Sequence, residues 1–259
     1  MVEMNLISEM SVAIEFRNVS KVYCLDDGRR VDALKNLNFS LQPGRMLGVI
    51  GSNGTGKTTM LHLAAGLAEP TSGEIVRSPP ANRRVGLIWQ DYRASLLPWR
   101  SVLGNLLFPF ELGKEIDLSD ARTRACQLLE QYLPDVKLNQ RLDELSGGQQ
   151  QMISLIRCAL QKPDLYLYDE PYSAIDQFRR WAWLKNSEKL RLESKASGIF
   201  VSHDLDEAIL VADRLLIFDK RGGTLEIENT TPRPRTIEHL DDPLHLECRS
   251  RALRFMNSA

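Results

Sequence analysis

Residues 51–59 have the types and spacing that phosphate chemistry requires. They follow an apolar run, residues 46–50, that reads as a strand, and they precede a helix-like segment, residues 60–65. In that setting they fit the phosphate-loop pattern G-x-x-x-x-G-K-[ST], whose glycines let backbone N–H groups point at phosphate oxygens. Lys57 is placed to reach the β- and γ-phosphates, and the Thr58 hydroxyl is placed to bind Mg²⁺. The predicted nucleotide-binding residues are Gly51, Ser52, Asn53, Gly54, Thr55, Gly56, Lys57, Thr58 and Thr59.

A glycine-rich strand-to-helix turn with a surface lysine is the alternative interpretation of this loop. The specificity of the motif in its strand-to-helix setting argues against it. Asp169 and Glu170 end a second apolar strand, residues 165–168, and are followed by Pro171. Beside a phosphate loop, Asp169 would hold Mg²⁺ and Glu170 would orient or deprotonate the attacking water. Without the loop, a solvated strand end would be the simpler interpretation.

The run Leu145–Gln151, LSGGQQQ, places two glycines at the start of a helix. Backbone N–H groups exposed there can bind an anion. The side chain of Ser146 either reaches a phosphate or only caps the helix. Together, and in this order, the runs GSNGTGKTT and LSGGQQQ resemble the ATP-binding cassette ATPases, and the similarity extends over nearly the whole chain.

The resemblance implies roles for further residues. Tyr23 would stack on adenine, although a strand aromatic in the core is the alternative. Gln90 would sense Mg²⁺ and the attacking water. His203 would contact the γ-phosphate, whereas a lone histidine at a strand end is otherwise more often structural. Residues 173–176, SAID, match the family's S-A-L-D loop with Ile175 in place of leucine. The implied catalytic residues are Glu170, His203 and Gln90, and the implied metal ligands are Thr58, Gln90 and Asp169.

The family also implies a mechanism. Two cassettes pair head to tail, so that ATP on the phosphate loop of one is closed over by the signature of the other. The implied signature residues are Ser146, Gly147, Gly148 and Gln149. Hydrolysis separates the two cassettes, and the motion drives a transporter. ATP and Mg²⁺ are therefore the expected ligands, and a second cassette, identical or related, is an expected partner.

The segment Leu96–Asn105, LLPWRSVLGN, resembles a run of the nitrate, sulfonate and taurine importer ATPases. The tail motifs at 232–235 and 241–243 resemble the same group. This resemblance implies an ATP-hydrolysing subunit that energises uptake of a small solute, such as nitrate, a sulfonate, taurine or bicarbonate, through a separate permease. A solute-binding protein would take part indirectly. Because residues 96–107 are very apolar, we expect them to form an exposed patch that docks the permease. The alternative is that they pack inside a helical insertion.

Strand and helix patterns along the chain must position these residues. Alternating residues predict strands at 12–16 and 37–41, and apolar runs predict strands at 85–89, 165–168, 198–202 and 214–218. Helical spacing predicts helices from about Thr58 to Leu67, from Ser119 onwards and after residues 146–148. Strands that alternate with helices indicate an α/β core. Residues 229–243 hold three prolines and read as a surface linker.

With the resemblance, the expected fold is α/β: a P-loop NTPase core with an antiparallel β subdomain and an inserted helical subdomain. The expected organisation is a first part of the core with the β subdomain at 1–90, the helical insertion with the signature at 91–160, a second part of the core at 161–228 and a C-terminal tail at 229–259.

Composition narrows the possible partners. The 33 basic and 34 acidic residues give a formal net charge of −1, so nucleic acid is not the expected partner. The four cysteines are scattered and read as reduced thiols of a cytosolic protein. No apolar run approaches the roughly 18 residues of a membrane span. Any membrane role must therefore come from binding to a membrane-embedded chain, and the resemblance to importer ATPases implies a peripheral place on the cytoplasmic face of the inner membrane.

Two other classes of function stay open at this point. One is a soluble ATP-binding cassette protein of DNA repair or translation. Repair proteins of this kind carry long coiled coils between the two motifs, whereas no sustained heptads occur here. Translation proteins carry two cassettes in one chain. The other class is a regulatory nucleotide-binding module, against which the presence of Glu170 and His203 argues.

Overall fold

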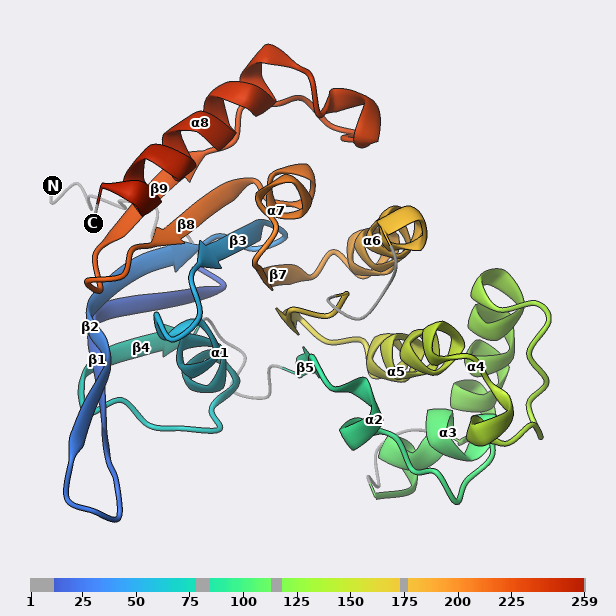
Figure 1. The fold of residues 1–259 in the computed structure, drawn as a ribbon. Helices are drawn as coiled ribbons and strands as arrows, with labels where there is room; N and C mark the ends of the chain where they lie inside the picture. Colours follow the sequence, from blue (N-terminus) through green and yellow to red (C-terminus); the bar gives the residue numbers. More distant parts are fainter. Residues whose placement is uncertain (1–11, 78–83, 113–117, 173–176, 259) are drawn as a thin grey trace, which may run out of the picture.

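The computed structural model describes residues 12–77, 84–112, 118–172 and 177–258. Residues 173–176, which match the S-A-L-D loop, lie outside the described residues. Within the described residues two sheets organise the fold, and helices are arranged around them (Figure 1).

The larger sheet has six strands in the order β5-β6-β7-β3-β8-β9. Strands β5, β6, β7, β3 and β8 pair in parallel, and β9 pairs antiparallel to β8. Such strands are covered on both faces, which explains why they read as continuous apolar runs. Their bounds are β3 Met46–Gly51, β5 Val85–Ile88, β6 Leu165–Asp169, β7 Ser197–Ser202, β8 Arg214–Phe218 and β9 Thr224–Glu228.

The smaller sheet has three antiparallel strands in the order β2-β1-β4. They are β1 Ile14–Cys24, β2 Arg30–Leu41 and β4 Ser72–Arg77. The first two strands are longer than the alternation at 12–16 and 37–41 predicted, because the hairpin continues through polar residues to the turn at residues 25–29.

Eight α-helices and two short 3₁₀ helices occur in the described residues. The helices α2, α3, α4 and α5 gather beside the β5 edge of the sheet, whereas α8 lies over β8 and β9 at the other edge (Figure 1). The α-helices are α1 Lys57–Ala65, α2 Tyr92–Ser95, α3 Val102–Leu112, α4 Leu118–Tyr132, α5 Gly147–Leu160, α6 Gln177–Glu193, α7 Leu205–Val211 and α8 Pro243–Asn257, and the 3₁₀ helices are η1 Leu142–Glu144 and η2 Ile237–His239. None of the helices in these ranges is long and apolar enough to cross a membrane.

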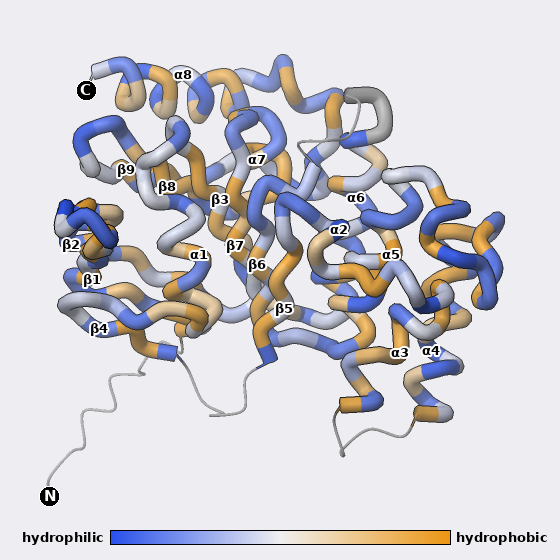
Figure 2. The backbone as a smooth tube through the Cα atoms, turned by 60° about the horizontal axis from the view of Figure 1, so that its bottom comes forward, coloured by the Kyte–Doolittle hydropathy of each residue, from blue (hydrophilic) through white to orange (hydrophobic). Residues whose placement is uncertain are grey.

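Each face of the large sheet contributes to its own core. Leu47 and Val49 of β3 pack with α1 and the antiparallel sheet, whereas Met46 and Ile50 pack towards the helices on the opposite face. This alternation follows from the two-residue period of a strand. Figure 2 shows hydrophobic colour concentrated along the central strands, between more hydrophilic outer segments. The sheet therefore holds its strand ends in fixed relative positions.

The interpretation of residues 229–243 as a surface linker was wrong for its first part. Asn229 and Thr231 are buried, and Asn229 donates hydrogen bonds to the backbone oxygens of Ile209 and Ala212. From Pro243, which occupies the first turn, the chain forms α8, which packs on α7, β8 and β9. Prolines exclude a continuous helix here but do not prevent tight packing through neighbouring side chains.

Candidate nucleotide site

The carboxyl ends of the parallel strands bring the predicted catalytic residues together. Tyr168 of β6 pairs with Ile88 of β5, and Ile50 of β3 pairs with Ser202 of β7. Because these strands run in the same direction, the residues that follow them meet at one edge of the sheet, where α/β proteins bind ligands. Gln90, Glu170, His203 and the phosphate loop all follow such strand ends.

The phosphate loop has the tight turn that its glycines predict. Gly56, immediately before α1, has a φ of 96°, and a Cβ atom there would collide with the carbonyl oxygen of Ala33 in β2. Only glycine fits this backbone without strain. No side chain caps α1 at Gly56, so the first N–H groups of the helix are left for a ligand. This is the geometry in which phosphate oxygens replace a helix cap.

Lys57 is folded back onto its own loop. Its side chain is 6% exposed, and Nζ donates to the carbonyl oxygens of Gly51 at 2.8 Å and Ser52 at 3.1 Å. Burial lowers the pKa of the ammonium group, and the negative charges of Glu170 and Asp169 partly oppose that shift. A triphosphate would replace two weak carbonyl acceptors with full anionic charge, which favours binding.

Thr58 and Asp169 provide oxygen atoms suited to Mg²⁺. The Thr58 hydroxyl donates to Oδ1 of Asp169 over 3.4 Å, from the first turn of α1 to the end of β6. Burial raises the pKa of Asp169, and the neighbouring Glu170 raises it further. A divalent cation would compensate this buried carboxylate, and Mg²⁺ is commonly held by one or two protein oxygens together with substrate phosphates. The two residues therefore fit the ion, whose chemistry would be to neutralise charge on the phosphate oxygens.

Glu170 is the centre of a cluster of polar contacts. Its Oε2 atom accepts from Nε2 of Gln90 at 3.4 Å and lies 3.5 Å from Nδ1 of His203, while Oε1 lies 4.0 Å from Nζ of Lys57. The backbone of Glu170 has a φ of 44°, which is uncommon for a residue with a side chain. Its N–H bonds to the carbonyl oxygen of Val201, which holds this turn beside β7. The carboxylate can thus accept a proton from a water molecule oriented by its neighbours.

The turn that carries His203 is fixed by residues that the sequence analysis missed. Ser202 Oγ donates to Oε2 of Glu207 at 2.7 Å and accepts from the N–H of Asp204 at 3.0 Å. Glu207 is buried, and its other oxygen lies 3.1 Å from Arg180 of α6. Burial raises the pKa of Glu207, and the contacts with Ser202 and Arg180 oppose this. An acidic residue inside the apolar pattern of α7 was the sequence signal for this support.

Tyr23, the predicted adenine platform, lies in β1 and its ring is accessible. It pairs with Val31 of β2, two residues before Ala33, the residue that touches Gly56. Its side chain is 36% exposed, and the ammonium of Lys21 lies 5.1 Å from the ring centroid. The ring is not a core aromatic, so that alternative is excluded. Its role in stacking on a base stays a prediction.

The signature residues form a complete capping box at the start of α5. The Ser146 backbone N–H donates to Oε1 of Gln149 at 2.9 Å, and the Gln149 N–H donates to the Ser146 hydroxyl at 3.3 Å. A Cβ atom on Gly147 would lie 2.9 Å from the Tyr92 hydroxyl, so any other residue there would require the tyrosine side chain to shift. Among the described residues, no hydrogen bond or ion pair joins the signature to the phosphate loop of the same chain.

The apolar segment 96–107 divides into a buried part and one exposed ring. Leu96, Val102 and Leu106 are buried among the helices, so the expectation of a continuous exposed patch was wrong. Trp99 is 72% exposed at the tip of the preceding loop. Helical spacing turns the other apolar residues inward, while Pro98 and Trp99 stand before the helix begins.

A buried amide shapes that loop. Asn105, fully buried in α3, accepts from the Leu97 N–H at 2.8 Å and donates to the carbonyl oxygens of Leu97 at 3.0 Å and Ser101 at 3.1 Å. Loop backbone that would otherwise lack partners is satisfied in this way. The sequence signal for this role was a polar residue, Asn105, inside an otherwise apolar helix, and the sequence analysis did not use it. The result is a rigid support for an exposed tryptophan.

Comparisons with known proteins agree with this geometry. A family model described as ABC transporter matches residues 34–173. The chain is 33% identical over 263 residues to the nitrate import ATP-binding protein NrtC of Synechococcus elongatus. The aligned region spans 95% of this chain but only 38% of that protein. It is 33% identical over 226 residues to the taurine import ATP-binding protein TauB of Pelagibacter ubique. This aligned region spans 83% of this chain and 82% of that protein.

A solved structure is also similar. The ATP-binding cassette MJ0796, described as a dimer in a post-hydrolysis state bound to ADP and Pi, matches with a TM-score of 0.69 and 26% identity, over 83% of this chain and 98% of that chain. These matches confirm the resemblance and the α/β P-loop fold that the motifs predicted.

Proposed function

The chain belongs to the ABC transporter family, and on that premise we propose that it is the ATP-hydrolysing subunit of an importer for a small anion. One observation supports this most: Lys57, Asp169 and Glu170 meet at the phosphate loop, and Gln90 and His203 both approach the carboxylate of Glu170. A regulatory nucleotide-binding module would not need a carboxylate with this set of partners.

Hydrolysis would be divided among these groups. Glu170 takes a proton from the attacking water, Gln90 and His203 hold the carboxylate and water in line, and Lys57 binds the phosphate charge. Thr58 and Asp169, with Gln90 as a further ligand, hold Mg²⁺. Asn53 and Thr59 complete the loop around the phosphates, and Tyr23 stacks on the adenine ring.

The active unit is a pair of cassettes. In the part of the chain that the structure describes, the signature at 146–149 makes no hydrogen bond to the phosphate loop of its own chain, so it is available to a nucleotide held by a second cassette. The dimeric form described for MJ0796 supports this arrangement. Whether the second cassette is the same chain or a relative depends on the transporter.

The permease docks at Trp99, and the chain works peripherally at the cytoplasmic face of the inner membrane. A large exposed ring on a rigid loop is a strong anchor for a partner's pocket. The cargo is a small anion or zwitterion, because nitrate and taurine appear in the names of the relatives. These relatives favour import over roles in DNA repair or translation.

The proposal is tested with this chain and its permease in proteoliposomes. We expect ATP hydrolysis that depends on Mg²⁺, and uptake of nitrate, taurine or an alkyl sulfonate when a matching binding protein is supplied. Glu170→Gln should abolish uptake while leaving the complex assembled. Hydrolysis by the assembled complex without uptake of any of the three solutes would reject the cargo class, and absence of hydrolysis would reject the enzyme itself.

A further inference from the structure

The C-terminal segment 229–257 holds the short helix α7 at both ends. Helix α7 spans only Leu205–Val211 and starts two residues after His203. Asp204 caps it, accepting from the N–H groups of Asp206 at 2.9 Å and Glu207 at 3.3 Å. The helix is about 10 Å long at 1.5 Å per residue. Since His203 directly precedes the capping residue Asp204, a displacement of either end of this short helix would also displace His203.

At the N-terminal end of α7, two residues of α8 contact Asp206. Nε2 of His245 lies 3.0 Å from Oδ1 of Asp206, and Nε of Arg249 lies 3.3 Å from the same oxygen. The His245 side chain is fully buried, and its Nδ1 atom has no hydrogen-bond partner. An ionised carboxylate only accepts, so the proton of a neutral His245 ring lies on Nε2.

This leaves the contact with Asp206 as the polar function of the buried ring. An apolar side chain would fill the same position without leaving a ring nitrogen unpaired. The presence of an imidazole at this buried position is therefore explained by its contact with Asp206 and not by packing.

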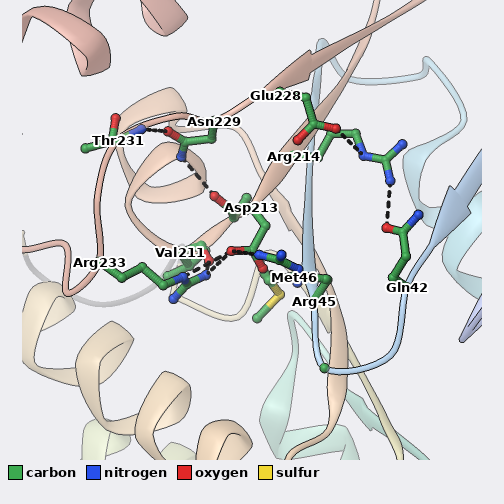
Figure 3. A network of polar contacts seen from close by, with 12 residues as sticks. Gln42, Arg45, Met46, Val211, Asp213, Arg214, Glu228, Asn229, Thr231 and Arg233 are labelled. Atoms are coloured by element: carbon green, nitrogen blue, oxygen red, sulfur yellow. Dashed lines mark hydrogen bonds and ion pairs between the residues drawn. The ribbon is translucent and has the colours of Figure 1, made fainter.

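At the C-terminal end, the chain from Asn229 to Arg235 binds the last carbonyl groups of α7, which a helix cannot satisfy internally. Nδ2 of Asn229 donates to Ile209 at 2.6 Å, and Nη2 of Arg233 donates to Val211 at 2.6 Å. The guanidinium of Arg235 donates to the carbonyl oxygen of Ala212. Figure 3 shows Asn229, Val211 and Arg233 converging here, with Arg233 also on Asp213.

We propose that the segment 229–257 is a positioning element of the ATPase, which sets His203 against Glu170 through α7, and that His245 and Arg249 are its positioning residues. This rests on the proposed function only for the role of His203 in hydrolysis. The contacts themselves predict that loosening α8 from Asp206 displaces the His203 ring from the 3.5 Å approach to Glu170.

The first test does not depend on activity. The chain has four histidines, so the ring signals of a full-length, histidine-labelled sample can be assigned by NMR with single substitutions. His245→Ala and Arg249→Ala should shift the His203 signal. Arg251→Ala, which removes the same charge from an exposed position of α8, should not. An unmoved His203 signal in both variants would overturn the proposal, whatever the enzyme does.

The second test measures single-turnover hydrolysis with protein in excess over ATP, so that slow variants stay measurable. His245→Ala should lower the rate roughly 3- to 30-fold, the range of coupling through packed contacts, with ATP affinity unchanged. His245→Gln, which keeps a donor near the position of Nε2, should restore most of the rate. In a His203→Ala background, His245→Ala should have no further effect.

An equal loss of rate with and without His203 would overturn the proposal, as would failure of His245→Gln to restore a folded variant. Hydrolysis missing from the parent chain would instead reject the proposed function, and the NMR comparison would then decide the positioning role alone.

Discussion

Nδ1 of His203 lies 3.5 Å from Oε2 of Glu170, the same oxygen that accepts from Gln90. One carboxylate oxygen is thus oriented by two neighbouring residues of the same chain. The left-handed backbone of Glu170 costs free energy, and such conformations persist where the surrounding structure enforces them, often at functional sites. Preorganisation of this kind lowers the cost of aligning the base during reaction.

Glu170→Gln should keep ATP binding and slow hydrolysis by roughly 10²- to 10⁴-fold, because it removes the proton acceptor and changes little else. The variant should also accumulate as an ATP-bound dimer, visible by size-exclusion chromatography. Asp164→Asn, at the opposite end of β6, is a matched control and should hydrolyse normally. Turnover near that of the parent chain would exclude Glu170 as the base.

Lys57→Met should lose affinity for ATP, measured by titration calorimetry, because it keeps the alkyl stem but removes the charge facing the phosphates. Burial already lowers the pKa of this ammonium, so the folded state gains little from the charge, and the melting temperature should not fall. Lys137→Met, at an exposed position, is the control. Unchanged ATP affinity in Lys57→Met would contradict the proposed phosphate cradle.

Ser146→Arg should abolish hydrolysis while the isolated chain still binds ATP, because in the proposed pair of cassettes the signature would act on the nucleotide of the partner. Mixing Ser146→Arg with Lys57→Met chains creates dimers in which one composite site carries both substitutions and the other carries neither. Partial recovery of hydrolysis on mixing is the expected result. A loss of ATP binding by the Ser146→Arg monomer would show that the site is not shared.

Asn105→Ala and Trp99→Ala should separate folding from docking. Asn105→Ala removes the side-chain partners of the Leu97 N–H and the Arg100 carbonyl oxygen, at about 1–3 kcal/mol for each group left unpaired, so its melting temperature should drop. Trp99→Ala should melt like the parent chain yet lose more than about 1 kcal/mol of affinity for the permease in detergent. A destabilised Trp99→Ala chain with normal permease binding would reject the docking role.

Cysteine reactivity should follow burial. Burial raises the pKa of Cys158 to about 12 and that of Cys248 to about 11, so at pH 8 almost none of either thiol is in the reactive thiolate form. Cys24 is exposed. Iodoacetamide labelling of the native chain, read by mass spectrometry, should modify Cys24 first, and all four sites should react in denaturant. Early labelling of Cys158 would mean that its helix opens readily.

Sequence patterns predicted the residues of the candidate site better than the distant residues that hold them in position. Residues 51–59 and 145–151 carry local patterns whose chemistry depends on near neighbours, and apolar runs such as 165–168 located the strands between them. The contacts from Asn229 to Ile209 and from His245 to Asp206 join positions about 20 and 39 apart, for which no local pattern exists. The position of α8 on α7 therefore depends on tertiary contacts such as that of His245 with Asp206.

The segment 96–107 shows a second limit. Its apolar character indicated either a surface patch or a packed helix. Residues such as Val102 are buried, so the segment packs among the helices, and Trp99 is its exposed ring. The start of α3 at Val102 separates the buried residue from the exposed one. Tertiary contacts such as those of Asn105 with Leu97 help to set where a helix begins.

The exposure of Trp99 also gives the molecule its own optical probe. The other three tryptophans, Trp89, Trp181 and Trp183, are half-buried, so water quenches and red-shifts the emission of Trp99 more than theirs. Transfer of that ring into an apolar pocket would move the intrinsic emission of the protein to shorter wavelength without any label. Assembly of the complex could then be followed in real time, in the same cuvette as ATP turnover, which would reveal whether the contact persists through a cycle or is remade in each one.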